Sequence, residues 1–108
     1  MAFDGVAFLK AQIAEVKQVF EYKKRTEAEE AEKLEYWRRL RDRFKPGSAE
    51  ARCLQGFIES AERSLQWERE AQERRRREME NLTLLVKALE AEKLHTLDDL
   101  LKGLSEED

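Results

Sequence analysis

An otherwise continuous helical pattern is interrupted at Phe44-Lys45-Pro46-Gly47-Ser48-Ala49-Glu50, near the middle of a chain of 108 residues. Proline disfavours helix in the residue before it, and glycine permits a tight reversal of the backbone. Ser48 is a good N-cap for a following helix. Both flanks of this stretch are rich in Ala, Glu, Leu, Lys and Arg, which favour helix most strongly. The sequence therefore predicts two long helices that double back on one another about Pro46-Gly47.

Capping signals define the remaining boundaries. Asp4 is a suitable N-cap, with Phe3 and Phe8 at the spacing of a hydrophobic staple. Thr96 and Asp99 have the spacing of a capping box. We therefore expect a single domain, 1–108, with helix over about 5–44, a turn at 45–48, helix over about 49–94, a short helix over about 97–102 and a frayed tail at 105–108.

Apolar residues recur in steps of three and four along both long segments, and we call these positions the seam. In the first segment the seam runs from Val6 to Phe44, and in the second from Leu54 to Leu89. In both it is apolar at the ends and polar in the middle, and folding about Pro46-Gly47 brings the two polar stretches together. The fold class predicted is an all-α, long antiparallel two-helix coiled-coil hairpin with a short C-terminal third helix, dimerising into a four-helix bundle.

Two further contacts follow from this arrangement. Cations at 23–25 should pair with carboxylates of 68–73, and carboxylates at 27–30 should pair with Arg63 and Arg69. The leucines of the short third helix should fold back over Phe3, Phe8 and Leu89 and cap the open end of the hairpin.

The composition restricts the classes of function. With 21 basic and 24 acidic residues the net charge is only −3, so no global field attracts nucleic acid or an acidic membrane. No apolar run approaches the roughly 20 residues that span a bilayer, so we expect no membrane association. Cys53 is the only cysteine, which fits a reducing cytoplasm. His95 is the only histidine, and no catalytic motif or metal-ligand spacing is present. We expect no enzyme activity, no cofactor, no metal and no small-molecule substrate.

Aromatic and aliphatic side chains outside the seam form a second, sparser stripe. The stripe consists of Val19, Tyr22, Tyr36, Leu40, Phe57 and Trp67. Aromatic residues at helical spacing outside a seam indicate a contact surface. The stripe either widens the contact between the two helices or binds another molecule, and a homodimer is the simplest form of the second possibility.

A basic patch lies at the predicted turn. Its cations are Arg38, Arg39, Arg41, Arg43, Lys45 and Arg52. Cations in the last turns of a helix also complement its dipole, so a purely structural role is the alternative. The run Arg74–Arg77 points around the whole helix, which is typical of a solvated surface with local ion pairs.

The function predicted is a non-enzymatic protein-interaction module, either a coiled-coil adaptor, a scaffold or an inhibitor. It would act through the off-seam stripe and the basic turn, with another protein and a second copy as partners. The alternative is a nucleic-acid-binding accessory protein that uses the turn arginines and Arg74–Arg77.

Overall fold

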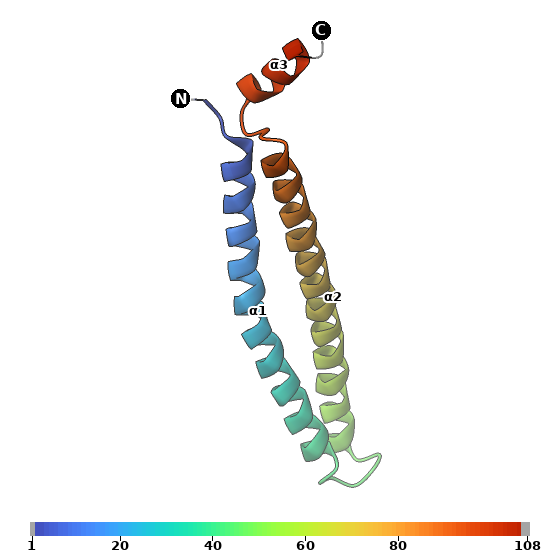
Figure 1. Ribbon diagram of the computed structural model, residues 1–108. Coiled ribbons are helices and arrows are strands. Elements are labelled where there is room, and N and C mark those ends of the chain that lie inside the picture. The colour runs from blue at the N-terminus through green and yellow to red at the C-terminus, as the bar shows by residue number, and fades with distance from the viewer. Residues whose placement is uncertain (1, 107–108) are drawn as a thin grey trace. The chain divides into compact units, whose positions relative to one another are not determined.

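The computed structural model describes residues 2–106, with side chains as far as Lys102. This part of the chain forms three helices and no strand: α1 (Gly5–Arg41), α2 (Ala49–Ala91) and α3 (Leu97–Glu106) (Figure 1). α1 and α2 pack as an antiparallel hairpin, which confirms the predicted fold class; dimerisation remains a prediction. The chain groups into two compact units, which we call the turn unit (Phe20–Arg74) and the terminal unit (Met1–Val19 with Arg75–Asp108).

The turn is longer than expected because α1 ends at Arg41 and not at Phe44. The amides of Arg43 and Phe44 bond three residues back, to Leu40 and Arg41 at 3.0 and 3.1 Å, which tightens the last turn. Gly47 has φ 82°, a conformation that costs glycine little. Ser48 caps α2, as predicted, through the amide of Ala51, which donates to its Oγ at 3.2 Å.

α2 ends three residues before the expected position, in a Schellman motif. The amide of Leu94 bonds to the carbonyl of Leu89 at 2.8 Å, and the amide of Lys93 to that of Glu90 at 3.2 Å. Lys93 adopts φ 57°, the left-handed conformation that this motif requires. Residue 93 is a lysine and not a glycine, so the sequence carries no C-cap signal for the end of α2 at this position.

The apolar seam forms the core of the turn unit. Leu34, Ile58 and Leu65 are 4, 1 and 4% exposed, and Ala31, Trp37 and Ala61 pack against them. Every seam position from Phe20 to Arg41 and from Leu54 to Gln72 is buried or half-buried. Phe44, the one predicted seam residue of this unit that lies beyond the end of α1, is 39% exposed.

The polar stretches of the two seams meet inside the turn unit, as predicted. Lys23 pairs with Glu68 at 3.6 Å, and Arg69 pairs with Glu27 at 3.1 Å. Gln72 is 6% exposed and donates from Nε2 to the carbonyl of Phe20 at 3.0 Å. The polar side chains therefore bridge α1 and α2 where apolar side chains are missing.

The terminal unit has its own apolar contacts, centred on Val6 and Val86, which are 2 and 6% exposed. The Asp4 carboxylate caps α1 by accepting from the amide of Ala7 at 3.0 Å. The rings of Phe3 and Phe8 lie 5.7 Å apart, which confirms the predicted staple.

α3 begins with the predicted capping box. The amide of Asp99 donates to Oγ1 of Thr96 at 3.3 Å, and Asp99 Oδ2 accepts from the amides of Thr96 and His95 at 3.0 and 2.9 Å. These two backbone hydrogen bonds lower the pKa of Asp99 below its ordinary value of 3.8. The helix continues to Glu106, beyond the expected 102, and residues 107 and 108 of the expected tail lie outside the described part.

The expectation that the leucines of α3 cover the open end of the hairpin is wrong for the leucines whose side chains the structure describes. Leu97, Leu100 and Leu101 are 67, 49 and 51% exposed, and Phe3 and Phe8 are 69 and 50% exposed. The segment that joins α2 to α3, residues 92–96, is short and is held by two hydrogen bonds of His95. The carbonyl of His95 accepts from the amide of Gly5 at 2.7 Å, and the amide of His95 donates to Asp99 Oδ2 at 2.9 Å. This link directs α3 beyond the ends of α1 and α2 (Figure 1).

Candidate interaction surfaces

The turn unit has two edges of different chemistry, one on each side of the seam. If the seam residues Leu34 and Trp37 occupy heptad positions a and d, each helix carries positions e and b on one flank and g and c on the other. An antiparallel pairing brings the e and b flanks of α1 and α2 to the same edge, and the g and c flanks to the opposite edge. We call these the charged edge and the aromatic edge.

The charged edge is closed by contacts between α1 and α2. Arg38 and Glu62, both at position e, form an ion pair at 3.1 Å. Arg69, also at e, pairs with Glu27 of the seam, and Arg41 donates to Oε1 of Gln55 at 2.8 Å. No aromatic residue occupies position e or b between Phe20 and Arg74. Exposed ion pairs of this kind contribute about 0–1 kcal/mol each. The charged edge therefore determines the register of α1 against α2 more than it adds to the stability of the hairpin.

The aromatic edge collects the predicted partner-binding residues of the turn unit. Tyr22, Tyr36, Phe57 and Trp67 lie at positions c, c, g and c and are 66, 58, 53 and 59% exposed. Leu40, at position g, is half-buried. The sixth predicted residue, Val19, is 43% exposed and belongs to the terminal unit.

Part of the aromatic edge is already packed within the chain. Phe57 stacks on Trp37 with ring centroids 5.4 Å apart and an angle of 16° between the planes. The ring of Tyr36 meets the same Trp37 edge-on at 5.2 Å. Trp37 thus holds both neighbouring rings in fixed positions while about half of each remains open to solvent.

A groove of about 480 Å³ lies along the aromatic edge. Its lining includes the small side chains Thr26 and Ser64, the ring of Trp67, and the carboxylates of Glu30 and Glu68. Glu68 Oε2 is buried and accepts no hydrogen bond within the described residues. A buried carboxylate oxygen without a donor is costly, so the groove is suited to a ligand group that can donate a hydrogen bond.

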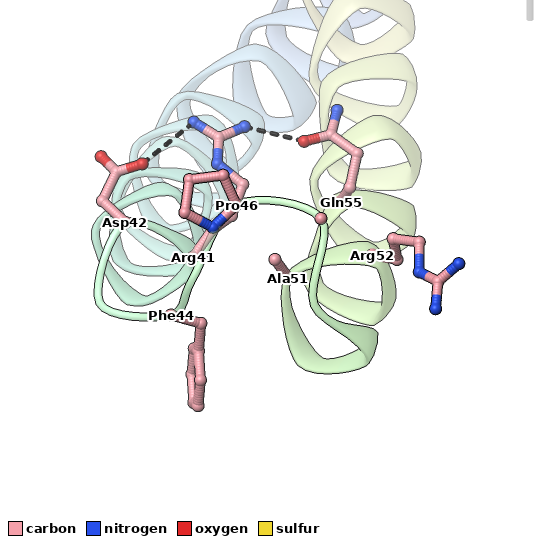
Figure 2. A pocket seen from close by; sticks show the side chains of 8 residues that line it. Arg41, Asp42, Phe44, Pro46, Ala51, Arg52 and Gln55 are labelled. Atoms are coloured by element: carbon pink, nitrogen blue, oxygen red, sulfur yellow. Dashed lines mark hydrogen bonds and ion pairs between the residues drawn. The ribbon is translucent and has the colours of Figure 1, made fainter.

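Three of the six predicted cations at the turn are engaged within the chain. Arg38 pairs with Glu62, and Arg39 pairs with Glu35 at 2.8 Å. Arg41 is held between Gln55 and Asp42, whose Oδ1 lies 3.5 Å from Nη2 (Figure 2). These three arginines organise the end of the hairpin.

The other three cations, Arg43, Lys45 and Arg52, are exposed and make no ion pair within the part of the chain that the structure describes. Around the turn a cavity of about 380 Å³ is lined by Phe44, Pro46 and other residues of both helix ends. Figure 2 shows the ring of Phe44 projecting away from the helices and Arg52 pointing away from Arg41. The turn therefore presents a basic surface with an exposed ring and not one convergent anion site.

The run Arg74–Arg77 does not form a basic face. Arg76 forms an ion pair with Glu80, Arg75 lies half-buried at a seam position, and Arg77 also has an interaction partner. The pair of Arg76 with Glu80, one turn along the helix, is typical of a solvated helix surface with local ion pairs.

One exposed apolar surface lies outside the predicted partner-binding residues, in the terminal unit. The expectation that α3 would cap the hairpin assigned Leu97, Leu100 and Leu101 to the interior, whereas about half or more of each is exposed. Their Leu-x-x-Leu-Leu spacing was the available signal, because helical peptides use that spacing to enter apolar grooves.

His95 lies in the terminal unit, and Cys53 lies on the aromatic edge, eleven residues before Ser64. His95 Nδ1 is 3.8 Å from Asp4 Oδ1 in the terminal unit, and Cys53 is exposed at position c of α2. Among the described residues no group of three or more His, Cys, Asp or Glu side chains is placed to hold a metal ion. None of the described helices is long and apolar enough to cross a membrane.

Comparison with protein-family models, with curated proteins and with solved structures gives no match to this chain.

Proposed function

We propose that this protein is a non-enzymatic protein-interaction module, of the adaptor, scaffold or inhibitor type, that binds through the aromatic edge and the basic turn. The observation that carries the proposal is the difference between the two edges. Arg38–Glu62 and Arg69–Glu27 close the charged edge, while four aromatic rings of the aromatic edge remain more than half exposed. Aromatic residues are enriched in protein interfaces because they offer a large contact area at low entropic cost.

The basic turn is a second, separate surface, and we propose an acidic protein as its partner. Arg43 and Lys45 adjoin Phe44 in the chain, Arg52 lies in the first turn of α2, and none of the three forms an ion pair among the described residues. An exposed ring next to cations suits a protein surface that combines carboxylates with an apolar pocket. A phosphate backbone would use the cations but not the ring. A cytoplasmic setting, which the single Cys53 suits, is part of the proposal.

Site-specific photo-crosslinking tests both surfaces. A photoreactive phenylalanine replaces Tyr36 on the aromatic edge, Arg43 at the turn, or Gln66 on the charged edge as the matched control, and the protein is irradiated in cells. We expect protein adducts from positions 36 and 43 and few from 66. Adducts at position 43 that disappear on nuclease treatment would establish the nucleic-acid alternative. Equal labelling from all three positions would contradict the proposal.

A further inference from the structure

We infer that the occupant of the aromatic edge is a second copy of this chain, packed antiparallel about a two-fold axis at the level of Ala31 and Ser64. This inference rests on the proposed function, because it names the partner of the same edge. It concerns the turn unit alone.

Ala31 and Ser64 lie at the same level of the hairpin. Ala31 packs against the core cluster that contains Leu65, the neighbour of Ser64. The pair Glu27–Arg69 lies one helical turn away on both helices and gives the same register. Ser64 is at position g, on the aromatic edge itself.

A two-fold axis at this level, perpendicular to the helices, sets α1 against α1 of the second copy in reverse direction. Tyr22 then meets Leu40, Tyr36 meets Thr26, and Glu29 meets Lys33. Each contact occurs twice by symmetry. Glu29 makes no ion pair within the described residues of its own chain. Lys33 pairs with Glu30 of its own helix at 3.2 Å, and an exposed pair of this kind contributes about 0–1 kcal/mol, so Lys33 can exchange this partner for Glu29 of the second copy.

The same operation sets α2 against α2 of the second copy. Phe57 lies over the position of Ala71, whose small side chain is only 5% exposed, Trp67 meets the exposed Ser60, and Ser64 meets its own symmetry mate. A large side chain thus faces a small one in these pairs, and none of the edge's large rings meets another large ring. Two helix surfaces interdigitate when large and small residues alternate in this way.

The groove on the aromatic edge receives Tyr36 of the second copy. Thr26, which the axis places opposite Tyr36, lines this groove together with Trp67 and Glu68. A tyrosine hydroxyl is a hydrogen-bond donor, and Glu68 Oε2 is a buried acceptor that has no donor among the described residues of its own protomer. The second copy therefore supplies a donor for Glu68 Oε2, which neither Lys23, paired with Oε1, nor Arg63, which also lines the groove, satisfies among the described residues.

The available apolar area reaches the lower limit of a specific interface. Tyr22, Tyr36, Phe57 and Trp67 are 53–66% exposed. At about 150–250 Å² for each aromatic side chain, these rings offer roughly 500 Å² per protomer. Two protomers then bury roughly 1,000 Å², the size at which specific interfaces begin.

Disulfide trapping in the full-length protein tests the position of the axis. A Ser64→Cys variant in a Cys53→Ser background places two thiols beside the axis, and we expect rapid covalent dimer formation under mild oxidation. Gln66→Cys in the same background is the matched control, at nearly the same level but on the charged edge. The native Cys53 lies eleven residues from the axis, which separates the two copies by about 33 Å, so wild-type protein should not crosslink.

Light scattering and sedimentation across a range of concentrations supply the second readout. We expect the wild-type protein to be a dimer. Tyr36→Phe or Glu29→Lys should each raise the dissociation constant of the dimer at least tenfold. Combining Glu29→Lys with Lys33→Glu should restore the dimer. Circular dichroism confirms that each variant is folded. A monomer at all concentrations, crosslinking through Cys53 or position 66, or a charge swap that fails to restore the dimer would each overturn the inference.

Failure of this inference and failure of the proposed function give different results. A monomer whose position 36 crosslinks another protein retains the proposed function and rejects self-association. A trapped dimer that yields no further adduct from position 43 supports self-association and rejects the basic turn as a docking surface.

Discussion

Replacing Lys93 by glycine should stabilise the protein, although the side chain points into no core. Lys93 holds φ 57°, where a residue with a Cβ costs about 1–2 kcal/mol relative to its ordinary conformations. Glycine removes this cost but orders a more flexible chain, and the substitution also removes a cation near the end of α2, worth about 0.3–1 kcal/mol. The added chain entropy costs about 0.5–1 kcal/mol, and Lys93 lies beyond the last turn of α2, where the dipole contribution is at its lower limit of about 0.3 kcal/mol. The middle of these ranges leaves a net gain in free energy of unfolding of about 0.5 kcal/mol.

Lys87→Gly is the matched control, because Lys87 is an exposed lysine in the regular part of α2. Glycine in a helix interior costs about 1 kcal/mol, so this variant should be destabilised. For a chain of this size 1 kcal/mol corresponds to about 4 °C in melting temperature. Thermal unfolding followed by circular dichroism, at one fixed protein concentration, should therefore show the two variants moving in opposite directions.

The opposite signs make the experiment decisive for the end of α2. If Lys93→Gly and Lys87→Gly both lower the melting temperature by similar amounts, residue 93 is helical and α2 continues as the sequence pattern suggested. The hydrogen bond from the amide of Leu94 to the carbonyl of Leu89 would then be absent, and the direction given to α3 would lose its physical basis.

Three further predictions concern the core, the charged edge and the start of α3. Ile58→Ala should lower the free energy of unfolding in urea by about 2–4 kcal/mol because Ile58 is 1% exposed, whereas half-buried Ile13→Ala should cost less; equal effects would contradict the core assignment. A double-mutant cycle of Arg38→Ala and Glu62→Ala should give a coupling below about 1 kcal/mol that fades with added salt, and a larger, salt-resistant value would refute the weak role assigned to this edge. The pKa of Asp99 is lowered in the folded protein, so its capping contribution is fully present above its ordinary pKa of 3.8 and is lost as pH falls through the lower folded value. Amide hydrogen exchange in α3 should accelerate in that acidic range. An Asp99→Asn variant that shows the same pH response would exclude this carboxylate as the cause.

The fold could be predicted because each of its decisive features is local or periodic. Pro46-Gly47 and the caps at Asp4, Ser48 and Thr96 act through hydrogen bonds to neighbouring backbone amides, so the sequence contains both partners. The seam repeats every seven residues, and only two antiparallel helices explain why its polar stretches coincide.

The features that escaped prediction depend on tertiary or backbone detail. The end of α2 depends on Lys93 in the left-handed conformation, and no residue pattern predicts this conformation for a lysine. The exposure of Leu100 and Leu101 depends on the direction of α3, which the hydrogen bond between Gly5 and His95 helps to fix. Arg38 and Arg41 were assigned to a binding surface, but their partners Glu62 and Gln55 lie on α2 and became visible only once α1 and α2 were paired. The partner of Arg39 is Glu35, four residues earlier on the same helix, and could have been found from the sequence.

The polar middle of the seam links the stability of the hairpin to its proposed binding. Lys23–Glu68 and buried Gln72 add less stability than apolar residues would, but a shift of α2 by one heptad would separate these pairs and bury charges against the apolar core. The polar contacts therefore select one register, as a polar residue in a coiled-coil core does. Register in turn decides which level of α1 lies beside Trp67 and Phe57, and hence whether the aromatic edge matches its own copy. A hairpin with a uniformly apolar seam would be more stable and could slide, and a sliding hairpin could not hold Tyr36 and Thr26 at equal distances from one axis.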